Sequence, residues 1–168
     1  MKISLQELAT APEAKICFDY TIDLRKEEVN FGFPFQEPVH IYGAVSDKAG
    51  VISLDATVHA DVFTNCARCN KPVRYEKEVN ISFILAKTIE NEQADDIIVV
   101  ETDSVELDEI VVPELLLDME MAVLCKEDCK GLCPKCGQDL NAGDCGCVKK
   151  EVDPRLAKLA QWLEENKE

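Results

Sequence analysis

The sequence predicts an α+β protein in which an antiparallel β-sheet with two helices is joined to a cysteine-rich, zinc-binding tail. Two observations predict this class. The first two thirds of the 168-residue chain repeatedly alternate apolar and polar residues, a period of two that is typical of strands burying one face. Eight of the nine cysteines form four close pairs, and thiolates a few residues apart are typical metal ligands.

Four alternating stretches predict the strands of the sheet. The first runs from Ile16 to Ile22, and the second begins at Val39 and ends in the turn 46–50. The third covers 52–62, and the fourth covers 73–85. The last three follow one another with turn residues between them, so we expect them to pair antiparallel. The alternation leaves open whether the sheet closes into a barrel.

Three further segments flank these strands. Residues 31–38 are rich in Pro and Gly, and we expect their aromatic side chains to tuck under the sheet. Residues 88–96 are polar and are expected to form an exposed, mobile loop, after which 97–100 would add one more strand. The segments therefore extend the sheet without adding a second core.

Two stretches have helical patterns. Apolar residues recur at helical spacing over 107–124, with Pro113 expected to kink this helix or mark its start. Asp153 and Pro154 are typical of a helix start and open a C-terminal amphipathic helix. The pattern divides the chain into a sheet with its packed helix (1–124), a cysteine-rich zinc knuckle segment (125–150) and a C-terminal helix (151–168).

The cysteine pairs allow more than one set of metal ligands. One partition gives two sites, formed by Cys66, Cys69, Cys125 and Cys129, and by Cys133, Cys136, Cys145 and Cys147. The alternative is a single ribbon-like site of Cys66, Cys69, Cys133 and Cys136, with the other four spare. A site of four thiolates has no open position for water or substrate, so we interpret the metal, zinc, as structural.

Other chemistries of the cysteines fit less well. A disulfide scaffold requires an oxidising compartment, and the mixed composition of residues 1–11 leads us to expect no signal peptide. The run L-C-P-K-C-G also occurs in rubredoxin-type iron sites. A thiol–disulfide oxidoreductase would place C-x-x-C at a helix start after a strand, which neither C-x-x-C here does. Zinc is therefore the expected cofactor.

Charge is distributed unevenly along the chain. The formal net charge is −15, and residues 90–120 contain twelve acidic residues and no Lys or Arg. This balance argues against broad electrostatic binding of nucleic acid. The sign reverses around the first cysteine pair, where four basic residues accompany one acid, Glu76. These candidates for phosphate contact are Arg68, Lys71, Arg74 and Lys77.

The sequence carries no recognisable catalytic constellation. It contains no glycine-rich phosphate loop, and its clustered carboxylates have no base or nucleophile nearby. We therefore expect neither enzyme activity nor a small-molecule substrate. With no apolar run long enough to cross a bilayer, we expect a cytoplasmic protein without a membrane partner.

Four motifs stand out along the chain: the hairpin C-A-R-C-N-K-P, the Leu-rich helix E-L-L-L-D-M-E-M, the cysteine tail beginning C-K-E-D-C-K-G-L-C-P-K-C-G, and D-P-R-L-A-K-L. Together they resemble the bacterial YceD family of large ribosomal RNA subunit accumulation proteins. The resemblance covers most of the chain. It implies a non-enzymatic role in producing or stabilising the RNA of the large ribosomal subunit.

This resemblance and the charge pattern suggest two modes of action. In the first, the zinc-stiffened hairpin contacts ribosomal RNA or an assembling particle through its basic residues, and the acidic segment faces a basic ribosomal protein. Phosphate contacts of this kind would position the protein without reading sequence. In the alternative, the chain is an acidic adaptor that contacts a basic ribosomal protein rather than RNA.

Overall fold

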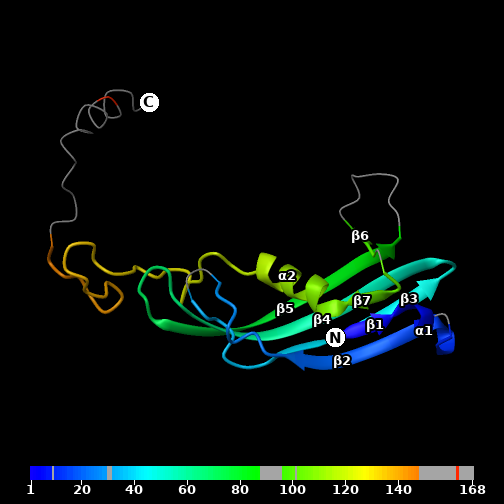
Figure 1. The fold of residues 1–168 in the computed structure, drawn as a ribbon. Coiled ribbons are helices and arrows are strands. Elements are labelled where there is room, and N and C mark those ends of the chain that lie inside the picture. The colour runs from blue at the N-terminus through cyan, green and yellow to red at the C-terminus, as the bar shows by residue number, and fades with distance from the viewer. Residues whose placement is uncertain (9, 30–31, 88–95, 101, 148–161, 163–168) are drawn as a thin grey trace.

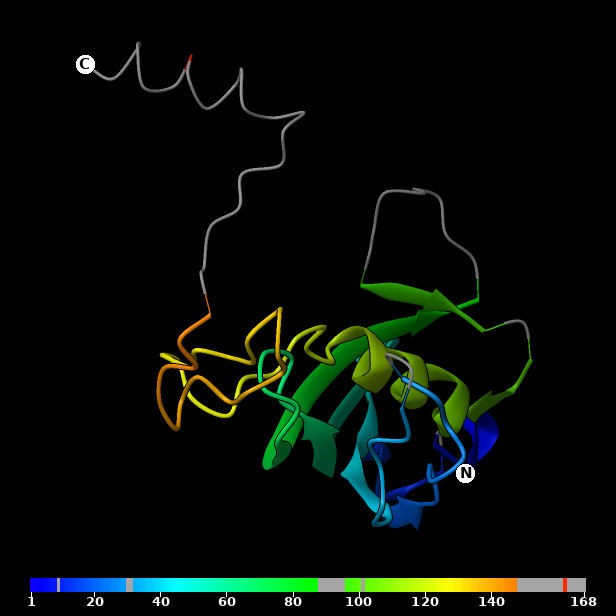
Figure 2. The ribbon, with the colours of Figure 1, turned by 90° about the vertical axis from the view of Figure 1, so that its left-hand side faces the viewer.

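A computed structural model describes residues 1–8, 10–29, 32–87, 96–100, 102–147 and 162. A five-stranded sheet with the order β2-β3-β4-β5-β6 forms one layer, and helix α2 and a small two-stranded sheet lie on one of its faces (Figure 1). The sheet curves around α2 (Figure 2). Strands β2 and β6 are its two edges, so the described part of the sheet is open rather than a closed barrel.

The four strands expected from the alternating pattern are confirmed. They are β2 (Lys15–Ile22), β3 (Val39–Lys48), β4 (Val51–Asn65) and β5 (Pro72–Ala86), each antiparallel to the next. The register of the long hairpin runs from Ile52 opposite Leu85 to Asn65 opposite Pro72. This hairpin holds the first cysteine pair at its tip, as the sequence predicts.

The fifth strand corrects the purely antiparallel expectation. Strand β6 (Ile97–Val99) is parallel to β5, with Ile84 opposite Ile97. A parallel neighbour requires a connection rather than a tight turn. The ten residues 87–96 between the two strands provide that length, so the sheet is mixed.

A second small sheet has no signal in the sequence pattern. Strand β1 (Lys2–Ser4) pairs antiparallel with β7 (Ser104–Glu106). The short helices α1 (Leu5–Leu8) and η1 (Pro12–Ala14) then lead into β2. Three-residue strands carry too few alternations to be distinguished from a loop, which explains why both were missed.

Helix α2 (Leu107–Leu117) confirms the existence of the predicted helix but ends seven residues before the expected 124. It runs through Pro113 rather than starting there. Tertiary contacts lie directly after its end. The carboxylates of Asp118 and Glu120 form ion pairs with Lys77 Nζ on β5, at 2.8 and 3.0 Å. The residues after the helix then approach the hairpin, where the backbone amide of Ala67 donates to the carbonyl of Val123 at 2.8 Å.

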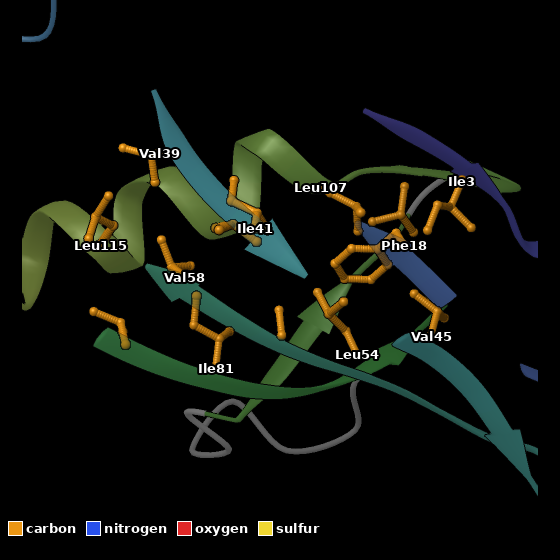
Figure 3. Close-up of a cluster of buried hydrophobic side chains, with 14 of the residues drawn as sticks. Ile3, Phe18, Val39, Ile41, Val45, Leu54, Val58, Ile81, Leu107 and Leu115 are labelled. Carbon is orange, nitrogen blue, oxygen red and sulfur yellow. The ribbon is translucent and has the colours of Figure 1, made fainter. Parts of the chain in front are cut away.

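The core lies between α2 and the sheet. Leu107 and Leu115 of the helix are almost fully buried and face Val58, Leu54 and Ile81 of the strands (Figure 3). Burying each such side chain contributes roughly 1.5–3 kcal/mol. The cluster continues to Phe18, Val45 and Ile3 at the other end. Sheet, α2 and the small sheet thus share one hydrophobic core.

Two expectations fall wholly or mainly on residues outside those described. They are the loop 88–96, of which only Asp96 is described, and the C-terminal helix 151–168, of which only Trp162 is described. Within the described part of the chain, no helix has the length and apolar character needed to span a membrane.

Candidate metal centres

The first cluster of cysteines joins the tip of the β4–β5 hairpin to the segment after α2. Cys66 and Cys69 come from the hairpin, Cys125 and Cys129 from the segment, and their four Sγ atoms lie within 4.8 Å of one another. The Sγ atoms of Cys66 and Cys129 are 3.8 Å apart, and those of Cys69 and Cys125 are 3.5 Å apart. A tetrahedron with metal–sulfur bonds of about 2.3 Å has edges of about 3.8 Å, so the residues fit one metal ion.

The second cluster is local in sequence. The Sγ atoms of Cys133, Cys136, Cys145 and Cys147 also lie within 4.8 Å of one another. The structure therefore brings the cysteines together in the two-site partition, and not in the single ribbon-like site that would combine the two C-x-x-C pairs. All nine cysteines, including the separate Cys17, are free thiols, so no disulfide scaffold forms.

Both C-x-x-C pairs adopt the same backbone knuckle. In the first, the amide of Cys66 donates to the carbonyl of Lys71 (2.8 Å), and the amide of Asn70 donates to the carbonyl of Cys66 (2.9 Å). The second repeats this pattern, with bonds of 2.8 Å from Cys133 to Gln138 and from Gly137 to Cys133. The residue after each second cysteine is left-handed, with φ of 57° at Asn70 and 74° at Gly137. Asn and Gly are the residues that tolerate this conformation best.

The thiol pKa values indicate sites built for a cation. A backbone hydrogen bond from Cys125 lowers the pKa of Cys66 to about 6, whereas hydrogen bonding with the Cys69 thiol raises the pKa of Cys125 to about 12. In the second cluster, peptide groups of the knuckle lower the pKa of Cys133 to about 6, and a neighbouring thiol raises that of Cys147 to about 12. The first thiolate forms readily and its charge opposes the next, so a metal cation is needed for all four to ionise.

The two clusters are fastened to each other by contacts that the sequence pattern does not reveal. The side-chain amide of Asn141 donates to Cys129 Sγ (3.4 Å), which links the loop between the two cysteine pairs of the second cluster to a cysteine of the first. The amide of Leu132 donates to the carbonyl of Arg68 (3.1 Å). Gly131 permits this approach, because its φ is 74° and a Cβ there would lie 2.9 Å from the Arg68 carbonyl oxygen. The hairpin tip and residues 125–147 thus form one unit, the cysteine module.

Two of the predicted phosphate-binding residues belong to this module. The guanidinium of Arg68 donates to the carbonyl of Cys129 at 2.9 Å, so it helps to close the first cluster. Lys71 is exposed and pairs with Asp139 at 2.7 Å, where this contact lowers the pKa of Asp139 to about 2. Lys71 therefore ties the hairpin to the second loop.

The other two lie further along β5. Arg74 is exposed, pairs with Asp61 at 3.2 Å and stacks over the ring of Phe63 at 5.0 Å. Lys77 faces the helix side of the sheet, where its side chain is only 14% exposed and contacts Asp118 and Glu120. The structure brings Arg68, Lys71 and Arg74 to the hairpin and places Lys77 away from them, in an internal ion pair.

Fold and clusters together define a class: a β-sheet protein that carries, at the end of one hairpin, two four-cysteine clusters with the geometry to hold a metal ion. The family model described as "Large ribosomal RNA subunit accumulation protein YceD" matches residues 54–163. This stretch covers both clusters and more than half of the chain, and the chain belongs to the YceD family. The family's name ties it to the accumulation of large-subunit ribosomal RNA.

Similar proteins occur in distant bacteria. The chain is 31% identical to "Uncharacterized protein YlbN" of Bacillus subtilis over 172 aligned positions, covering 100% of this chain and 99% of the relative. It is 32% identical to "Uncharacterized protein Rv2926c" of Mycobacterium tuberculosis over 116 positions, which cover 67% of this chain and 56% of that protein. No solved structure matches the chain.

Proposed function

We propose that this protein is a cytoplasmic, non-enzymatic factor in the accumulation or assembly of large-subunit ribosomal RNA, and that it contains two structural zinc ions. The observation that carries the proposal is the pair of preformed four-cysteine clusters in a chain of the YceD family. Closed sites of this kind stabilise a shape and leave no position for a substrate. Their role is to hold the cysteine module as a rigid binding element.

The zinc content is the first test of this proposal. Two zinc ions per chain are expected by elemental analysis of untagged protein purified without chelator. One zinc would leave four thiols without a metal and contradict two structural sites. Iron in place of zinc would give a red preparation and contradict the choice of metal.

We assign the contact with the assembling particle to the exposed cations of the hairpin, Lys71 and Arg74. Their ion pairs with Asp139 and Asp61 are surface contacts, which typically contribute only about 0–1 kcal/mol. A phosphate can therefore replace either carboxylate at small cost. Arg68 and Lys77 are supporting residues in this proposal, because their side chains contact the module and the end of α2.

The particle contact is tested by reversing both exposed charges. The variant Lys71→Glu/Arg74→Glu is expected to lose co-sedimentation with large-subunit precursors while it retains two zinc ions. Lys48→Glu, at the exposed end of β3 and away from the cysteine module, is the control for a reversed surface charge and should sediment like the unmodified protein. Unchanged co-sedimentation of the double variant would contradict the assignment.

The acidic adaptor is supported by a specific observation. Each of the four basic residues already has an acceptor within the protein, and each zinc bound by four thiolates would add a formal charge of about −2. The two sites would therefore make the net charge of −15 more negative by about 4. If the adaptor is correct, purified protein binds a basic ribosomal protein and does not shift large-subunit RNA at moderate salt.

A further inference from the structure

A groove lies beside the base of the cysteine module and has no role in metal binding. Its volume is about 700 Å³, within the roughly 300–1,000 Å³ of small-molecule sites. One wall is the segment 32–36, and the others are the end of β4 and the start of β5. We call it the hairpin groove. Its lining includes Phe33, Gln36, Phe63, Asn65 and Arg74.

The wall formed by 32–36 is held firmly. The side chain of Phe35 is 1% exposed and packs in the hydrophobic core, and its backbone forms an antiparallel β-bridge with Val62 of β4. The amide of Phe63 donates to the carbonyl of Pro34 at 2.9 Å. Phe33 lies between Gly32 and Pro34. Gly32 exchanges two backbone hydrogen bonds with Val29, of 2.8 and 3.1 Å, and the ring of Pro34 restricts its own backbone.

Phe33 is 59% exposed although its neighbour Phe35 is buried. The expectation that the aromatic side chains of this segment tuck under the sheet is therefore wrong for Phe33, because Phe35 already occupies the core position. The exposed ring of Phe33 presents aromatic surface beside the groove. Aromatic side chains exposed in this way are the surfaces on which bases of single-stranded nucleic acid stack.

The strand side of the groove supplies a cation and a hydrogen-bonding group. The guanidinium of Arg74 lies over the Phe63 ring, 5.0 Å from its centroid, and also contacts Asp61 at 3.2 Å and Glu37 at 3.8 Å. Asn65 on this side, and Gln36 on the same wall as Phe33, add side-chain amides, each of which can donate and accept. An aromatic face, two amides and one cation match the three parts of a nucleotide: a flat base, its polar edge and a phosphate.

We propose that the hairpin groove binds an unpaired nucleotide of RNA, with the base stacked on Phe33 and the phosphate at Arg74. The inference rests on the proposed function and specifies how the particle is contacted. Stacking on an aromatic residue favours the binding of each base, and at Arg74 the phosphate would replace two exposed ion pairs, those with Asp61 at 3.2 Å and Glu37 at 3.8 Å. Stacking therefore provides the affinity in a protein whose net charge of −15 opposes RNA.

The test measures binding of fluorescein-labelled hexauridine and hexaadenosine RNA to the zinc-loaded full chain by fluorescence anisotropy. Phe33→Ala should weaken binding by about 5- to 150-fold, and Phe33→Trp should retain it. Tyr42→Ala removes an aromatic that is also exposed, 41%, but lies outside the groove, and should leave binding unchanged. An RNA duplex of about 20 base pairs, long enough to stay annealed, should bind more weakly than its separate strands, because its bases are already stacked and paired.

Several results would overturn the inference. They are equal affinities of Phe33→Ala and the unmodified protein, equal binding of duplex and single strand, or no oligonucleotide binding by a protein that still co-sediments with large-subunit precursors. The last result would leave the proposed function standing and direct the contact to a ribosomal protein. Failure of the unmodified protein to co-sediment at all would instead overturn the proposed function.

Discussion

The sheet and the cysteine module are held together by different forces. The sheet buries a continuous set of apolar side chains against α2. Among the described residues, the cluster around Cys66, Cys69 and Cys129 is packed by two further apolar residues, Val73 and Leu124. The module otherwise relies on backbone hydrogen bonds and the polar contacts of Lys71 and Asn141. Hydrophobic burial can fold the first region alone, whereas under the proposed function bound metal holds the second.

Removing the metal should separate the two regions most strongly. Structural zinc sites bind with roughly 10–16 kcal/mol of apparent free energy, so chelation should release residues 125–147 from their fold and leave β3 and β4 intact. Hydrogen exchange should show lost amide protection in the module alone. Cys129→Ser should reproduce the effect and Cys17→Ser should not. Protection of the module amides without metal would contradict the comparison.

A cavity in the core should have the reverse effect. Leu107 is fully buried, and Leu107→Ala should lower the free energy of unfolding by about 2–5 kcal/mol in urea titrations while zinc content stays unchanged. Leu117 on the same helix is 80% exposed, and Leu117→Ala is the matched control with little expected change. Loss of zinc in Leu107→Ala would show that the regions are not independent.

The contact between the two clusters can be tested with a pair of glycines. Gly131 and Gly137 share a φ of 74°, but only Gly131 faces a neighbour, the Arg68 carbonyl. Gly137→Ala should cost about 1–2 kcal/mol of backbone strain, and Gly131→Ala should cost more because of the added clash. The measurement is the chelator concentration that releases zinc. Equal values for the two variants would argue against the close approach.

The smallest effect concerns the link between β5 and the end of α2. A hydrogen bond from Tyr75 lowers the pKa of Glu120. A carboxyl whose pKa is depressed by folding stabilises the protein above its unfolded pKa of about 4.3, and this contribution is lost as pH falls through the folded value. Glu120→Gln should lower the free energy of unfolding by less than about 1 kcal/mol at neutral pH.

This difference between Glu120→Gln and the unmodified protein should shrink as the pH is lowered below the folded pKa. Denaturation midpoints at neutral pH and near pH 3 measure it. Glu76→Gln is the control, because that side chain is 77% exposed. A difference that grows in acid would contradict the sign.

The sequence predicted the features whose signal is periodic or local. The four long strands follow from alternation, and the hairpin position of Cys66 and Cys69 follows from the two strands around it. Both clusters combine cysteines in the way that proximity along the chain suggests. Side-chain type and spacing were sufficient for the strands, the hairpin and the second cluster because each depends on neighbouring residues. The first cluster joins pairs more than fifty residues apart, and the sequence offered it only as one of two partitions.

The features that were missed depend on tertiary contacts. The parallel direction of β6, the early end of α2 and the exposure of Phe33 are each decided by what lies beside the segment. The bond from Asn141 to Cys129 joins residues whose types alone carry no metal signal. Asn141 can be recognised as a hydrogen-bond donor to Cys129 only when the first cluster is known to lie next to it.

The continuity of β4 with the metal knuckle restricts how this hairpin can change in length. Val58, Ala60 and Val62 face the core, and Cys66 follows four residues after Val62. Because successive side chains of a strand point to opposite faces, one inserted residue would turn both thiols of the knuckle to the other side of the sheet. Two inserted residues would preserve their side. In proteins that keep the first cysteine cluster, the length of this hairpin should therefore vary by even numbers of residues in each strand. The two thiols then stay on the same side of the sheet.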